Sequence, residues 1–89
     1  MKHTYKIKIE GRVQGVGFRF SAREIAKNLG VAGYVQNRPD GSVKIVASGE
    51  ESKLNEFLSW GRKGPSMAHV VNVDIEEIPF AEYDEFFVR

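Results

Sequence analysis

The order of strand-like and helix-like segments most strongly restricts the fold of this 89-residue chain. Apolar and charged residues alternate over 5–13, a pattern typical of a half-buried strand. Apolar residues then recur from Ala22 to Leu29 at helical spacing, which predicts an amphipathic helix with one apolar stripe. Gly30 follows where a left-handed C-terminal cap is expected. The first third of the chain therefore predicts a strand, a loop and a helix.

A hairpin is predicted next. Residues 31–36 and 42–48 have strand character, and the segment between them, 37–41, contains the turn residues Asn, Pro, Asp and Gly. Ser48 is followed three residues later by Glu51, a spacing that indicates a capping box at the start of a second helix.

The last third repeats the helix-then-strand order. An apolar stripe over 54–58 predicts the second helix, which should end near Gly61. Val71, Val73 and Ile75 alternate with polar residues and predict a fourth strand with these three on one face. Pro79 should stop that strand, and 85–89 can form a short final one.

The predicted order is therefore βαββαβ with a short terminal strand. Each helix has a single apolar stripe, so both helices should cover one face of a mostly antiparallel sheet. This is an α+β arrangement, the ferredoxin-like sandwich.

Composition limits the class of protein. The length suits one domain, 1–89, and the 42% hydrophobic and 28% charged residues suit a soluble globule. The chain has no cysteine, which excludes disulfides and thiolate chemistry and favours a reducing compartment such as the cytoplasm. With a net charge of +1, no apolar run of membrane length and no signal-peptide pattern, we expect neither a nucleic-acid nor a membrane partner.

A glycine-rich segment between the first strand and the first helix suggests an anion site. Glycines in Gly15–Arg19 let consecutive backbone N–H groups converge, and the helix start adds unpaired donors. Arg19 adds a planar cationic fork suited to phosphate oxygens. From spacing alone, an ordinary glycine turn followed by a surface arginine is about equally plausible. The usual nucleotide-loop patterns are absent.

Two segments resemble the acylphosphatase family. Ile9–Arg19 is similar to the first signature of that family. Gly33–Asn37, followed by Gly41, Val43 and Gly49, is similar to the second. The resemblance extends over essentially the whole chain and implies a ferredoxin-like fold. It also implies hydrolysis of the carboxyl–phosphate anhydride of acyl phosphates, with inorganic phosphate as product and competitive inhibitor.

The resemblance also implies roles for individual residues. The phosphate-binding residues would be Gln14, Gly15, Val16, Gly17, Phe18 and Arg19. Arg19 and Asn37 would be catalytic, with Asn37 positioning the attacking water. No metal, no cofactor and a monomeric enzyme are expected. Without the resemblance, Asn37 would be interpreted as a turn residue. Arg12 and Arg23 flank the loop and either add positive potential or are ordinary surface charges.

Three other interpretations compete with this one. A ferredoxin-like RNA-binding module would place aromatic residues on its central strands, and 42–48 contains none. A catalytically silent anion-sensing domain would share the same loop. An acylphosphatase-like domain at the start of a larger maturation protein is the third, although a free-standing enzyme is preferred because the chain ends at Arg89 without zinc-finger cysteines.

Overall fold

The computed structural model describes residues 1–89 as seven elements in the order β1, α1, β2, β3, α2, β4, β5. The strands are β1 (Lys2–Arg12), β2 (Ala32–Asn37), β3 (Val43–Glu50), β4 (His69–Ile78) and β5 (Phe86–Val88). The helices are α1 (Phe18–Leu29) and α2 (Glu51–Gly61). This order confirms the prediction from the sequence.

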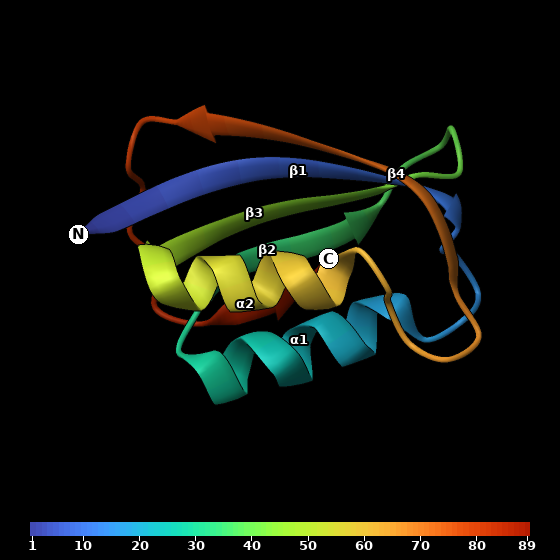
Figure 1. Ribbon diagram of the computed structural model, residues 1–89, viewed down its shortest axis with the longest axis horizontal. Helices are drawn as coiled ribbons and strands as arrows, with labels where there is room; N and C mark the ends of the chain where they lie inside the picture. The colour runs from blue at the N-terminus through green and yellow to red at the C-terminus, as the bar shows by residue number, and fades with distance from the viewer.

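The strands form one sheet in the order β4-β1-β3-β2-β5. The pairs β1–β4, β1–β3 and β2–β3 are antiparallel, and only β2–β5 is parallel. Both helices lie on the same face of this sheet (Figure 1). The expected α+β sandwich, with two helices covering a mostly antiparallel sheet, is therefore confirmed.

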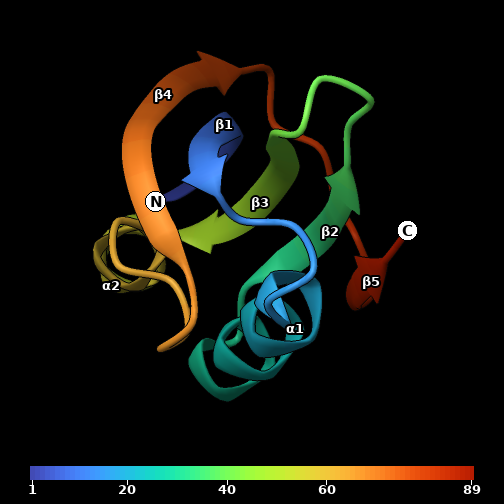
Figure 2. The same cartoon turned by 90° about the vertical axis from the view of Figure 1, so that its right-hand side faces the viewer.

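The strand directions determine where the chain can build a site. β1 and β2 are each antiparallel to β3, so they run parallel to each other and end at the same end of the sheet. Residues 13–17 leave β1 at this end and lead into α1, and Asn37 closes β2 there. Figure 2, which looks onto this end, shows the loop passing in front of the sheet to the start of α1.

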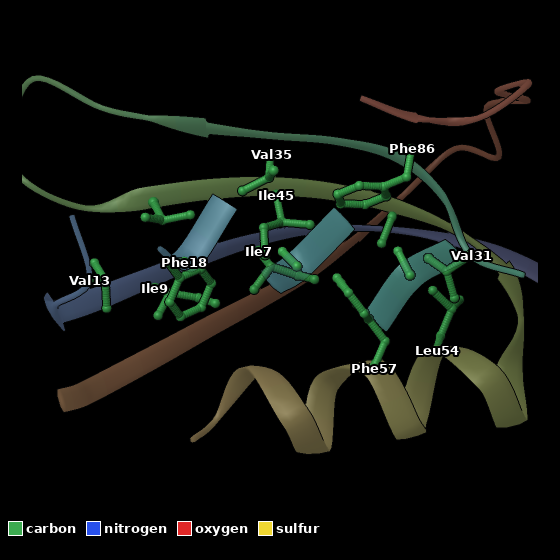
Figure 3. Close-up of a cluster of buried hydrophobic side chains, with 14 residues drawn as sticks. Ile7, Ile9, Val13, Phe18, Val31, Val35, Ile45, Leu54, Phe57 and Phe86 are labelled. Carbon is green, nitrogen blue, oxygen red and sulfur yellow. The ribbon is translucent and has the colours of Figure 1, made fainter. Parts of the chain in front are cut away.

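The core lies between the helices and the sheet (Figure 3). Ile7 and Ile9 of β1 and Ile45 of β3 face Phe18 of α1 and Phe57 of α2, and all five are at most 2% exposed. Burying one such side chain stabilises the fold by about 1.5–3 kcal/mol. These contacts fix α1, and with it the glycine loop, against the end of the sheet.

The prediction for β4 was wrong at Val71, which is 70% exposed. The pairing of β4 with β1 shifts register at Glu10 and Gly11, so the ladder contains a bulge. A bulge inserts one extra residue and changes which side chains face the core. Val70 packs against the core in place of Val71, and Val73 packs there as predicted. Gly11 allows the close approach, because a Cβ there would lie 2.2 Å from the carbonyl oxygen of His69.

The predicted capping box at Ser48 was also wrong. β3 continues through Glu50, and α2 begins without a side-chain cap. The Ser48 hydroxyl instead donates to the carbonyl oxygen of Ala81 at 2.7 Å and lies 2.6 Å from the Thr4 hydroxyl. Strand pairing therefore prevailed over the local capping pattern, and Ser48 attaches the β4–β5 connection to the sheet.

At the other helix the cap prediction is confirmed. Gly30 has φ 74°, and its N–H meets the carbonyl oxygens of Ala26 and Lys27. Neither helix has the length and apolar character needed to cross a membrane.

Candidate active site

The loop between β1 and α1 contains two left-handed glycines. Gly15 has φ 74° and Gly17 has φ 78°, a conformation that residues with a Cβ adopt only at a cost. Gly17 is the N-cap of α1, and no side chain caps the helix there. The first turn of α1 also contains no acidic residue. The free N–H groups at this end of the helix are therefore available to an anion.

Phe18 anchors the loop to the core. Its ring is 2% exposed and lies 5.2 Å from the Trp60 ring, centroid to centroid. Gly64 fits closely beside it, because a Cβ at Gly64 would lie 2.8 Å from a Phe18 ring carbon. The start of α1 is thus held in a closely packed environment, although Gly15 and Gly17 in the loop before it are exposed. Such rigidity keeps the N–H groups in place without a ligand.

Arg19 follows directly on the anchored residue. Its side chain is half-buried, and Nη1 donates to the main-chain oxygen of Arg89 at 3.0 Å. The N–H of Arg89 in turn donates to the carbonyl oxygen of Val35 at 2.8 Å. The guanidinium is therefore held over the edge of the sheet beside β5, and its other N–H donors make no hydrogen bond within the protein.

Asn37 ends β2 on the same side. It pairs with Val43 across the ladder, and its Oδ1 is buried without a hydrogen-bond partner. A buried acceptor without a partner costs about 1–3 kcal/mol. The side-chain amide of Asn37 thus has hydrogen-bonding capacity that the protein does not use.

These residues line one pocket of about 350 Å³. Its polar and glycine lining consists of Gly15, Gly17, Arg19, Arg23 and Asn37. Its apolar lining consists of Val13, Phe18, Phe20 and Val88. The pocket therefore combines a helix N-terminus, two guanidinium groups and one unsatisfied amide with an apolar wall.

The sequence matches the model of the acylphosphatase family over residues 5–88. The chain belongs to the acylphosphatase family. It is 51% identical to an acylphosphatase of Thermotoga maritima over 94% of this chain and 93% of that one. The structure of an acylphosphatase from Coxiella burnetii superimposes with a TM-score of 0.95 at 39% identity, over 99% of this chain and 93% of that one. For an acylphosphatase from Bacillus subtilis the TM-score is 0.94 at 36% identity, over 100% and 99%.

The acylphosphatase resemblance assigned six residues to phosphate, and the structure separates them into two groups. Four of them line the pocket: Gly15, Gly17, Phe18 and Arg19. Gln14 and Val16 do not. The side chain of Gln14 instead donates through Nε2 to the carbonyl oxygens of Arg38 at 2.8 Å and Ser42 at 2.9 Å. Gln14 therefore ties the loop to the β2–β3 hairpin that follows Asn37.

The hairpin is itself held by Asp40. The carboxylate of Asp40 accepts hydrogen bonds from the Ser42 hydroxyl at 2.6 Å and the Ser42 N–H at 2.9 Å. These bonds to Ser42 lower the pKa of Asp40 to about 2. Asp40 and Gln14 together hold the hairpin backbone next to Asn37 in place, although neither lines the pocket.

Three residues that line the pocket were not predicted as site residues from the sequence. Val13, Phe20 and Val88 form much of the apolar wall. Phe20 could have been identified, because an aromatic side chain directly after Arg19 lies outside the apolar stripe of α1; it is 65% exposed. Val88 could not, because it reaches the pocket only through the pairing of β5 with β2.

Proposed function

We propose that this protein hydrolyses acyl phosphates to a carboxylate and inorganic phosphate in the pocket between α1 and the end of β2. The observation that supports this best is the convergence of the left-handed glycine loop, Arg19 and the unsatisfied amide of Asn37 on one pocket. Membership of the acylphosphatase family supports the anhydride as the substrate group.

In this proposal the phosphoryl group binds at the N-terminus of α1. Backbone N–H groups from Gln14 to Arg19 surround its oxygens, and the guanidinium of Arg19 contributes two parallel hydrogen bonds. Phosphoryl transfer needs mainly positioning and compensation of charge on the equatorial oxygens, and these donors supply both. Gln14 and Val16 do not line the pocket, so in this proposal they contribute only main-chain N–H groups. The side chain of Gln14 is already bonded to the hairpin.

Asn37 holds the water in this proposal. The amide oxygen accepts a hydrogen bond from the water, and the amide nitrogen is a donor, so the pair can fix its orientation. An amide is a poor base, so Asn37 positions the water without removing its proton. The unpartnered Oδ1 supports this role, because a bound water satisfies it.

The remaining steps need no further side chain. The water oxygen bonds to phosphorus, and the bond from phosphorus to the acyl oxygen breaks with its electron pair going to the carboxylate. The water proton passes to an oxygen of the phosphoryl group, which leaves as inorganic phosphate. A carboxylate is a good leaving group without protonation, so a general acid is not required.

The test is hydrolysis of a small aryl acyl phosphate by the purified protein in water enriched in ¹⁸O. We expect turnover, with the label in the phosphate and none in the carboxylate. Asn37→Ala should slow this turnover, because it removes the amide that positions the water. Asn28→Ala is its matched control and should turn over like the wild type, because Asn28 is exposed on α1 and lies outside the pocket. Absence of turnover in the wild type would favour the silent anion-sensing domain, and label in the carboxylate would exclude attack at phosphorus.

A further inference from the structure

A second cation faces the pocket in addition to Arg19. Arg23 follows Arg19 by four residues on α1, and both line the pocket. Residues at this spacing lie on the same face of a helix, ~6 Å apart along its axis. A ligand bound at Arg19 and extending along α1 therefore reaches Arg23 next.

Arg23 has no partner within the protein. It forms no hydrogen bond and no ion pair within 4.0 Å. Arg23 also lines a neighbouring pocket, together with Asp84 and Glu85. Neither carboxylate forms an ion pair with Arg23. The guanidinium is exposed, so it can turn toward either pocket. Its five N–H donors remain free for an anion from solution.

An apolar side chain of α1 lines the same pocket as the two arginines. Phe20 is 65% exposed and lines the same pocket as Arg19 and Arg23. An exposed ring at this position offers a surface for the hydrocarbon part of an acyl chain. The three α1 residues therefore present two cations and one apolar surface to the pocket.

We propose that Arg23 binds a second anionic group at the far end of the acyl chain, and that this site prefers acyl phosphates whose acyl group ends in a carboxylate or phosphate. The inference rests on the proposed function, because it places the phosphoryl group at Arg19. It makes Arg23 a specificity residue that contacts the substrate away from the reacting atoms. The length of the acyl group is chosen to match the ~6 Å that separates Arg19 from Arg23 along the helix axis. The bridging anhydride oxygen, a carbonyl carbon and two methylenes between phosphorus and the terminal carboxyl carbon span roughly 6 Å when extended.

Stable phosphonates test this directly. One probe has four methylenes between its phosphonate and a carboxylate; the matched probe has a methyl group in place of the carboxylate. Each is measured as a competitive inhibitor of a neutral acyl phosphate at low salt. We expect the carboxylate to improve binding to the wild type about fivefold, a modest gain because Arg23 is exposed to solvent. In Arg23→Gln the two probes should bind equally well.

Two further variants control for charge and position. Lys27→Gln removes a cation one turn further along α1, outside the pocket, and should keep the full preference. Arg23→Lys keeps the charge and should retain a preference of about twofold. An equal loss in Lys27→Gln and Arg23→Gln would overturn the inference, because it would indicate a general positive potential. So would an unchanged preference in Arg23→Gln.

The proposed function is tested separately in the same experiment. If the wild type fails to hydrolyse the neutral acyl phosphate, the proposed function itself is wrong. If hydrolysis occurs but the wild type binds both phosphonates equally, only the role of Arg23 is wrong.

Discussion

Replacing Gly17 with alanine tests whether its left-handed conformation serves the anion site or only the helix. Gly17 and Gly30 stand at the two ends of α1 with nearly equal φ angles of 78° and 74°. A Cβ at either position meets nothing within 4 Å, so neither substitution causes a clash. Only Gly17 lines the pocket, which makes Gly30→Ala a matched control.

The expected cost follows from the backbone alone. A left-handed L-alanine costs about 1–2 kcal/mol, and the stiffer unfolded chain recovers part of this, roughly 0.4–1 kcal/mol. Each substitution should therefore lower the free energy of unfolding by about 1 kcal/mol, a Tm decrease of roughly 4–8 °C. Thermal and denaturant unfolding, followed by circular dichroism, measure this loss in both variants.

The two variants should differ in anion binding. Alanine disfavours the left-handed conformation at position 17, and relaxation away from it would move the N–H groups at the start of α1. We therefore expect the inhibition constant of inorganic phosphate to rise about tenfold in Gly17→Ala, the loss of one charge-assisted hydrogen bond. Gly30→Ala should keep the wild-type value. If both variants lost the same stability and both bound phosphate like the wild type, the anion site would not lie at this loop.

Three further predictions concern metal ions, acid stability and sulfate. Activity should survive exhaustive chelation, because no three His, Asp or Glu side chains are grouped to hold a metal ion; a loss restored by added magnesium or zinc would contradict this. Because its pKa falls from 3.8 to about 2 on folding, Asp40 contributes stability that is complete above its unfolded pKa and is lost as the pH falls toward 2. Asp40→Asn should therefore flatten the stability profile between about pH 5 and pH 2 in acid titrations, whereas an unchanged slope would contradict the shift. A crystal grown in sulfate should contain the ion at the N-terminus of α1; an empty loop with sulfate bound elsewhere would count against the anion site.

The arrangement of the fold could be predicted because each element has a clear local pattern. The stripe of α1 and its Gly30 cap depend only on neighbouring residues, and both appear in the structure as expected. The direction of the strands then follows from the order of elements, which explains why the sequence alone sufficed to place Asn37 near the glycine loop.

The errors arose where distant parts of the chain decide the local structure. Val71 faces solvent because Gly11, far away in sequence, introduces a bulge in the paired strand. Ser48 bonds to Ala81 and Thr4 instead of capping a helix, and neither partner is a sequence neighbour. Val88 joins the pocket only through a parallel pairing at the sheet edge. In each case a tertiary contact overrode the local pattern.

The measurement that most directly tests the account compares phosphate binding and turnover in Arg19→Ala and Asn37→Ala. We expect Arg19→Ala to raise the phosphate inhibition constant and to lower kcat, because Arg19 holds the phosphoryl group throughout the proposed reaction. Asn37→Ala should lower kcat by a factor on the order of 100 while leaving phosphate affinity near the wild-type value. Circular dichroism must first show that both variants fold. Near-normal turnover with strongly weakened phosphate binding in Asn37→Ala would contradict the account and place Asn37 in the anion site.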